Sequence, residues 1–159
     1  MRGGSGLHVE LFDVPGKVAL CMETGEAAYE LAGKPGDTVG VEVRSGEQQL
    51  LYIPGCARMT GALKWRLAGA SVVLFDGTLW QDDEMIRRGL GPKTGKRMGH
   101  MSVSGPDGTI AAFRDIAVKR KIFVHINNSN PILLDESEER GMLVKEGWEV
   151  AYDGMEVSP

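Results

Sequence analysis

Histidine and cysteine are scarce in this sequence, which has three histidines and two cysteines among its 159 residues. Cys21 and Cys56 lie far apart and form no C-x-x-C motif, which excludes a disulfide-rich scaffold and a thiolate zinc clip. A reducing, cytoplasmic location is therefore expected. The three histidines, His8, His100 and His125, cannot form an H-x-H-x-D-H or H-E-x-x-H run, so the sequence excludes those metal motifs.

Long apolar runs and excess positive charge are also missing. No stretch approaches the roughly 20 apolar residues that a bilayer span needs, and no secretory apolar region follows Met1. The net charge of -4 argues against nucleic acid or an anionic membrane as a general partner. The length suits one ordinary domain. We expect a frayed, glycine-rich start over residues 1–6 and a single domain over 7–159.

The sequence pattern changes between the two halves of the chain. The first half indicates strands joined by turns, whereas the second alternates helices with buried apolar strands, which is typical of a parallel sheet with helices on its face. The predicted class is therefore α/β, with a mixed sheet and helices on one face. A long segment over 80–99 is expected to be a lid-like loop. We expect strands over 7–14, 18–22, 38–43, 49–53, 71–75, 121–124 and 148–152, and helices over 60–68, 109–118 and 137–146.

Chemically reactive side chains stand where three of the predicted strands end. Cys56 comes after strand 49–53, Asp76 follows 71–75 and His125 follows 121–124, while His100 stands in a Gly-His-Met-Ser segment. If these strands are neighbours, their carboxyl ends share a rim where thiolate, carboxylate and imidazole can ligate or tune a metal. Each residue also has a structural interpretation: a small buried cysteine, an Asx-turn aspartate, or a histidine satisfied in a core or loop.

Amide and aromatic side chains accompany these candidates. Asn127 and Asn128 follow His125 closely, and their amides can fix the tautomer of its imidazole. An Asx-rich turn is the alternative explanation for both. Trp80, at the start of segment 80–99, is a candidate substrate-lid residue, with simple packing as the alternative.

Five segments carry a specific combination of motifs, over residues 15–20, 52–57, 74–80, 99–102 and 124–133. Together they resemble the pyrroloquinoline quinone biosynthesis protein B family, and the resemblance runs from about Leu7 to Val157. That family is similar to the metallo-β-lactamase superfamily, whose fold is a four-layer αββα sandwich of about twice this length. The resemblance therefore implies that the chain is the C-terminal half of such a sandwich.

The resemblance also implies residue roles. His125 matches the superfamily's last metal-binding histidine, and Cys56 falls near the position of a metal-bridging aspartate. Asp76 and His100 match the strand-end acid and the Gly-His-x-Ser histidine of the tRNA-processing relatives. His125 and Cys56 are therefore predicted metal ligands, and Asp76 and His100 are predicted catalytic proton handlers or orienting residues. The implied cofactor is iron or zinc.

The sequence departs from the superfamily in one respect, because the principal metal motif belongs to the N-terminal half. A catalytic metal usually needs about three protein ligands. The chain alone is therefore expected to bind metal weakly and to be inactive. If the missing half packs against its sheet, the isolated chain is also expected to expose a large apolar patch.

For the complete family, the resemblance implies an iron-dependent hydroxylase that uses dioxygen on the tyrosine ring of a cross-linked glutamate–tyrosine precursor. Two alternatives stay open: a metal-dependent hydrolase, and a non-enzymatic carrier that aids transport of the quinone or its precursor to the periplasm. The expected partners are that precursor, other proteins of pyrroloquinoline quinone biosynthesis, and either a second copy or the missing N-terminal half.

Overall fold

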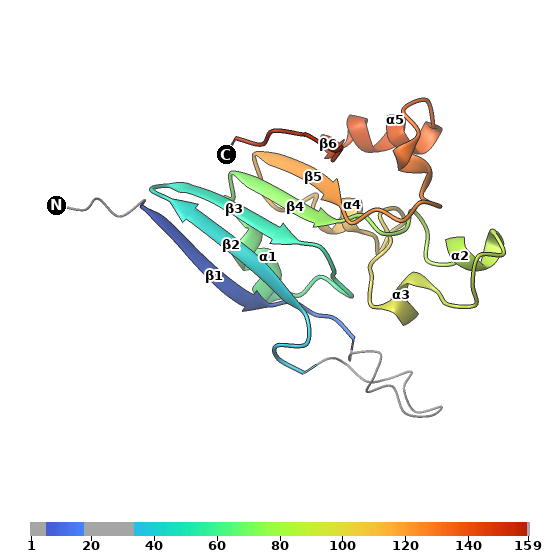
Figure 1. Ribbon diagram of the computed structural model, residues 1–159, viewed down its shortest axis with the longest axis horizontal. Helices are drawn as coiled ribbons and strands as arrows, with labels where there is room; N and C mark the ends of the chain where they lie inside the picture. Colours follow the sequence, from blue (N-terminus) through green and yellow to red (C-terminus); the bar gives the residue numbers. More distant parts are fainter. Residues whose placement is uncertain (1–5, 18–33, 159) are drawn as a thin grey trace.

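The computed structural model describes residues 6–17 and 34–158, which build one six-stranded sheet in the order β1-β2-β3-β4-β5-β6 (Figure 1). Strands β1 to β3 are antiparallel, whereas β3 to β6 run parallel to one another. The carboxyl ends of β3, β4 and β5 therefore meet at one edge of the sheet. The strands are β1 Leu7–Asp13, β2 Val39–Ser45, β3 Gln48–Ile53, β4 Val72–Asp76, β5 Arg120–Val124 and β6 Trp148–Val150.

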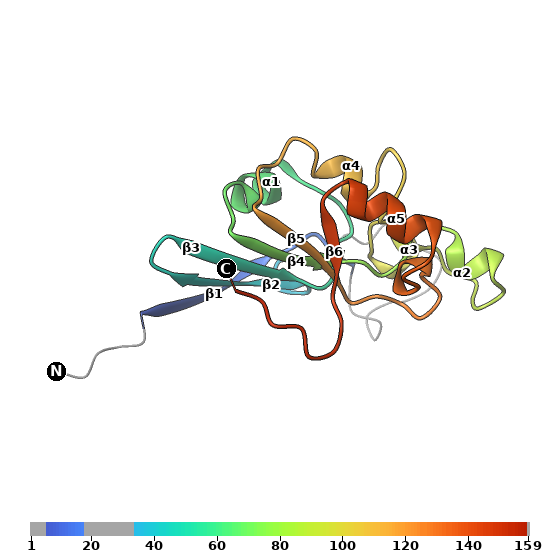
Figure 2. The same ribbon diagram turned by 90° about the horizontal axis from the view of Figure 1, so that it is seen from above.

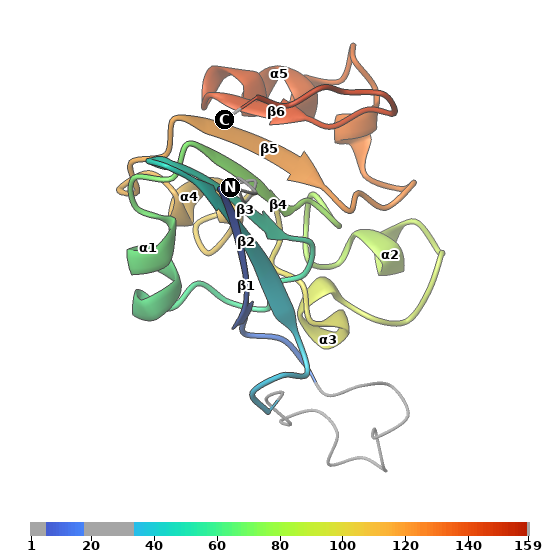
Figure 3. The ribbon, with the colours of Figure 1, turned by 60° about the vertical axis from the view of Figure 1, so that its left-hand side comes forward.

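Three helices cover one face of this sheet, and two further helices lie beyond the carboxyl ends of its parallel strands (Figures 2 and 3). The covering helices are α1 Gly61–Leu67, α4 Thr109–Ala112 and α5 Glu138–Lys145, and the outlying pair is α2 Glu84–Arg87 and α3 Gly95–Met98. A 3-10 turn, η3 Pro131–Leu133, precedes α5. This arrangement confirms the predicted mixed sheet with helices on one face.

Local sequence explains where the longer helices begin. The Thr60 hydroxyl accepts the Leu63 amide at the start of α1, and the Ser137 hydroxyl accepts the Arg140 amide at the start of α5. Gly147, which follows the C-cap residue Glu146 of α5, takes a φ of 74°, a conformation that glycine adopts without strain.

The core lies between the sheet and its three covering helices. Phe75, Phe113, Phe123 and Trp148 form a chain of ring contacts there, with centroids 4.0–5.0 Å apart. The other fully buried core side chains include Leu51, Ile53, Leu67, Val73 and Leu143.

The opposite side of the sheet carries no helix in the described part of the chain (Figure 2). One apolar row there runs across four strands through Leu11, Val41, Tyr52 and Leu74, which are register partners in turn. We call this side the helix-free face. Its exposed apolar residues are Leu7, Val9, Leu11, Val39 and Tyr52, and Val41, Val43, Leu50 and Leu74 are partly buried beside them.

Two predicted elements differ from the structure. The helix expected over 109–118 stops at Ala112, because the backbone from Ala117 onward already pairs with the segment before β4: Ala117 accepts the Gly69 amide and the Lys119 amide donates to Ala70. The segment 80–99 is not one open loop, since it contains α2 and α3. The strand expected over 18–22, Cys21 and most of the frayed start lie outside the described residues.

None of the helices within residues 6–17 and 34–158 has the length and apolar character that a bilayer span requires.

Candidate metal centre

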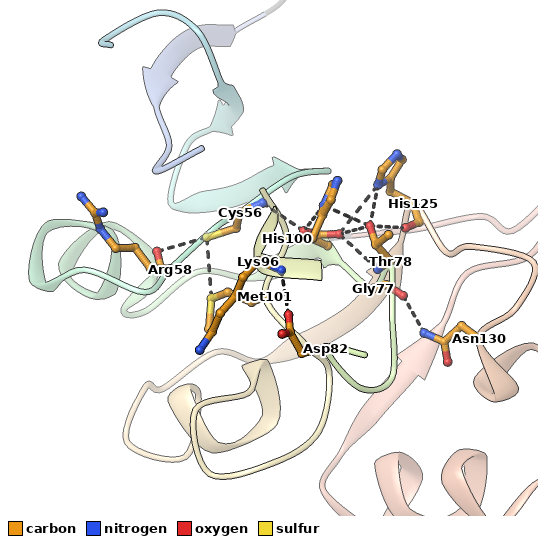
Figure 4. Close-up of polar contacts among 11 residues, drawn as sticks. Cys56, Arg58, Gly77, Thr78, Asp82, Lys96, His100, Met101, His125 and Asn130 are labelled. Atoms are coloured by element: carbon orange, nitrogen blue, oxygen red, sulfur yellow. Dashed lines mark hydrogen bonds and ion pairs between the residues drawn. The ribbon is translucent and has the colours of Figure 1, made fainter. Parts of the chain in front are cut away.

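The parallel part of the sheet brings three of the predicted residues together at its carboxyl edge, namely Asp76, His100 and His125. Figure 4 labels the two histidines. Asp76 is the last residue of β4 and pairs with Val124, the last residue of β5. His125 follows at once, and His100 comes directly after α3 and its left-handed Gly99. The prediction that neighbouring strands share this rim is therefore confirmed.

These three side chains form a compact donor cluster. One potential ligand atom from each of Asp76, His100 and His125 lies within 4.8 Å of the others. The His100 and His125 rings stack with centroids 5.2 Å apart and an interplanar angle of 28°. Asp76 is fully buried, whereas the side chain of His125 is 54% exposed, so the cluster opens toward solvent through His125.

The Asp76 carboxylate has both oxygens engaged. Oδ2 accepts the Cys56 amide at 3.0 Å and lies 2.7 Å from Nδ1 of His100, and Oδ1 accepts the amide and hydroxyl of Thr78 at 3.1 and 2.6 Å. Burial alone would raise the pKa of Asp76. Hydrogen bonds from His100 and Thr78, the nearby imidazole of His125 and the charge of His100 outweigh it and lower that pKa, so the buried carboxylate stays ionised.

The backbone at His125 is unusual, because this residue has a φ of 51°. A non-glycine residue in this left-handed region is uncommon and is held there by its surroundings. Two backbone hydrogen bonds flank His125: the Gly77 amide donates to the Val124 carbonyl oxygen at 2.8 Å, and the Asn127 amide donates to the Thr78 carbonyl oxygen at 3.1 Å. They connect the turn at His125 to the segment that follows β4. The Asp76 carboxylate raises the pKa of His125 against the effect of partial burial.

Cys56 contributes its backbone to the cluster, and its thiol lies elsewhere. The Cys56 sulfur is fully buried, 3.3 Å from the carbonyl oxygen of Arg58 and 3.9 Å from Sδ of Met101 (Figure 4). Burial raises the pKa of this thiol to about 12. A metal prefers a thiolate, so the ligand role of Cys56 stays a prediction that the position of the thiol does not favour.

The contacts and burial of the accompanying amides and the aromatic residue involve other parts of the chain. The Asn127 side chain donates to Ser129 at 2.7 Å, and Asn128 is exposed. Trp80 is buried and lines a hollow of about 440 Å³ together with Ile110 and Met142. The roles predicted for Asn127, Asn128 and Trp80 therefore stay predictions.

The sequence interpretation missed two residues that contact the site. The Thr78 hydroxyl lies within hydrogen-bond distance of Asp76, His100 and His125, and the Asn130 side chain donates to the Gly77 carbonyl oxygen at 2.8 Å. The signal for Thr78 was present, since a threonine two residues after a strand-end aspartate can bond back to its carboxylate.

The donor set fits a divalent metal. Two imidazoles and a carboxylate suit zinc and ferrous iron, and the ligand atoms already lie close together. The Asp76 carboxylate is already occupied by four hydrogen bonds. The two imidazoles are therefore the donors of this set that are most available to a metal. Two such donors are fewer than the roughly three protein ligands of a catalytic site, and the expected weak metal binding by the chain alone stays a prediction.

Comparison with protein families matches residues 2–126 to the beta-lactamase superfamily domain. Among curated proteins, the chain is 54% identical to "Coenzyme PQQ synthesis protein B" of Gluconacetobacter diazotrophicus and 52% identical to that of Xanthomonas oryzae pv. oryzae. Each alignment covers 97% of this chain but only 50% and 51% of the relative. The chain thus spans about half the length of the curated relatives it matches.

Comparison with solved structures also matches this chain to about half of a longer protein. The chain superposes on zinc-bound PqqB from Methylobacterium extorquens with a TM-score of 0.88 and 49% identity, covering 98% of this chain and 51% of that one. The matched portion is the C-terminal half, as the sequence motifs predicted. YhfI from Bacillus subtilis, a metallo-beta-lactamase fold protein, superposes over 95% of this chain with a TM-score of 0.55 at 9% identity, which supports the fold alone.

Proposed function

The chain belongs to the beta-lactamase superfamily, and on that premise we propose that Asp76, His100 and His125 form one wall of a divalent-metal site in a protein of pyrroloquinoline quinone biosynthesis. The observation that carries the proposal is the cluster itself, whose ligand atoms lie within 4.8 Å of one another at the carboxyl edge of a parallel sheet. The relatives named PQQ synthesis protein B supply the pathway, and zinc in the similar solved structure supports the metal.

In this proposal, the chain's own residues orient and expose the donors. His125 is the metal ligand that faces solvent, and His100 is held against the Asp76 carboxylate, where it can hold or pass a proton at Nδ1. Asp76 keeps its negative charge in the buried layer and fixes both imidazoles. A bound iron or zinc would act as a Lewis acid and, for iron, would activate dioxygen.

For the complete protein, we propose hydroxylation of the tyrosine ring of a cross-linked glutamate–tyrosine precursor, in which one atom of dioxygen enters the ring and an external two-electron reductant converts the other to water. Metal-dependent hydrolysis and non-enzymatic carriage of the quinone are the competing outcomes. Assays on the full-length protein separate them: hydroxylation stops without dioxygen, hydrolysis continues without it, and carriage survives dialysis against a chelator.

The metal site is tested by titrating zinc into His125→Ala, with His8→Ala as the matched control, because His8 lies on β1, away from the cluster. We expect His125→Ala to weaken zinc binding by at least about tenfold, the usual size of effect for losses around metal sites, and His8→Ala to leave it unchanged. Equal zinc affinity in wild type and His125→Ala would eliminate the proposed ligand.

A further inference from the structure

We infer that Thr78 is a positioning residue whose hydroxyl holds His125, and assists in holding His100, with a proton on Nδ1, so that Nε2 of both rings is left for the metal. This inference rests on the proposed function for the metal, but the hydrogen positions that it predicts belong to the chain itself. The backbone of Thr78 is anchored on both sides, because its amide donates to Asp76 at 3.1 Å and its carbonyl oxygen accepts the Asn127 amide at 3.1 Å.

A hydroxyl has one proton, and four acceptors or ring nitrogens surround that of Thr78. The distances from Oγ1 are 2.6 Å to Oδ1 of Asp76, 2.9 Å to Nδ1 of His125, 3.1 Å to Nδ1 of His100 and 3.1 Å to the carbonyl oxygen of His125. The carboxylate is both the shortest contact and the only negative acceptor among these four, so the proton points to Asp76. The Thr78 oxygen is then left as an acceptor for the two rings.

This assignment determines the protonation of His100. Its Nδ1 lies between two oxygens that can only accept from it, namely Oδ2 of Asp76 at 2.7 Å and Oγ1 of Thr78 at 3.1 Å. An unprotonated Nδ1 would face two lone pairs at hydrogen-bond distance. His100 therefore carries a proton on Nδ1, with the carboxylate as its main acceptor.

The position of the proton on His125 depends on Thr78 more strongly than that on His100. Its Nδ1 is 3.7 Å from Asp76, beyond an ordinary hydrogen bond, and 2.9 Å from Thr78. The hydroxyl thus connects the buried carboxylate to the exposed imidazole: Asp76 accepts from Thr78, and Thr78 accepts from His125. Without this hydroxyl, the Asp76 carboxylate at 3.7 Å is the neighbour of Nδ1 that remains, and because this distance exceeds a hydrogen bond, the preference for a proton on Nδ1 over Nε2 weakens.

The test compares Thr78→Val, which keeps the shape but removes the hydroxyl, with Thr78→Ser, which restores it. The readout is the imidazole ¹⁵N chemical shifts of the metal-free full chain at alkaline pH, where the shifts report the neutral tautomers. We expect wild type and Thr78→Ser to show His125 and His100 protonated on Nδ1. In Thr78→Val, the His125 signals should move to a mixture of both tautomers, while His100 keeps its own.

A second readout is zinc affinity of the same variants. We expect Thr78→Val to lose about 10- to 100-fold, the usual effect of removing a residue that orients a metal ligand, and Thr78→Ser to recover most of it. Thr109→Val is the matched control, because the Thr109 hydroxyl is equally buried but has no hydrogen-bond partner. It should change neither readout.

Two results would overturn the inference without any variant having to fold: wild-type His125 protonated on Nε2, or a wild-type mixture of its tautomers. A His125 signal that stays on Nδ1 in folded Thr78→Val would do the same. The proposed metal site fails on a different observation, an unchanged zinc affinity in His125→Ala. The two failures are therefore distinguishable.

Discussion

The helix-free face predicts that the isolated chain associates through its sheet. Val9 and Leu11 on the edge strand β1 are 61% and 65% exposed, side by side with other apolar residues. Full burial of such a side chain is worth about 1.5–3 kcal/mol, so covering the exposed part of these two gains about 2–4 kcal/mol per chain. Replacing both by lysine removes this gain from each of the two chains of a dimer, so it should raise the dissociation constant of the dimer by about 10³- to 10⁶-fold.

The assay is sedimentation velocity over a wide range of protein concentration, for wild type and for the double variant Val9→Lys with Leu11→Lys. The control is Trp65→Lys, because Trp65 is 82% exposed but lies on α1, on the other side of the sheet. We expect wild type and Trp65→Lys to associate and the double variant to stay monomeric. A wild-type chain that is monomeric throughout and melts cooperatively would refute the reasoning, as would equal dissociation by Trp65→Lys.

Two other perturbations test how the site is held. A Cβ at Gly77 would lie 2.9 Å from Cβ of Phe123, so Gly77→Ala should destabilise the chain by about 1–3 kcal/mol in urea unfolding, whereas Gly141→Ala, with open space around it in α5, should stabilise it by about 0.5–1 kcal/mol. The folded state raises the pKa of His125 above its ordinary value of 6.5, so the protonated imidazole stabilises the folded chain. This stabilisation is complete below pH 6.5 and is lost as the pH rises through the raised pKa. The pKa of Asp76 is lowered in the folded chain, so the ionised carboxylate stabilises the fold above pH 3.8, and this stabilisation is lost as the pH falls through the lowered pKa. The urea midpoint of the metal-free chain should thus fall between about pH 6 and about pH 8, and His125→Gln should flatten that fall; an equal fall in both proteins would contradict it.

The architecture followed from the sequence because its signals were local. Alternation in 39–43 predicted a strand, which is β2, although the residues that it buries are Gly40 and Glu42 and the valines lie on the helix-free face. Thr60 marked a helix start that the structure places at the next residue. The convergence of Asp76, His100 and His125 needed one further rule, that parallel strands end at a common edge.

What the sequence could not provide was the direction of side chains after a strand ends. The backbone of Cys56 reaches the cluster while its sulfur turns to Arg58 and Met101. The ligand role of Cys56 therefore stays a prediction, because its place in the sequence does not determine where its sulfur points. The shortening of α4 has a similar origin, since pairing of its downstream backbone with a distant loop overrides local helix preference.

The hydrogen bonds to Asp76 also explain why a buried charge is retained at the centre of this edge. Each carboxylate oxygen accepts a backbone amide, from Cys56 on Oδ2 and from Thr78 on Oδ1. Only a group with two accepting oxygens satisfies both amides. In Asp76→Asn, whichever way the side chain is turned, its NH₂ group faces a backbone N–H.

We therefore expect Asp76→Asn to destabilise the chain by about 1–3 kcal/mol, the cost of a buried donor left without an acceptor, although it removes a buried charge and keeps the shape. Asp82→Asn is the matched control: one Asp82 oxygen accepts the Lys96 amide, and the substituted amide can present its own oxygen there. Urea unfolding of the two variants at neutral pH measures the difference. If Asp76→Asn were no less stable than Asp82→Asn, the carboxylate would not be required by its backbone donors, and the ordering of the imidazoles around it would need another cause.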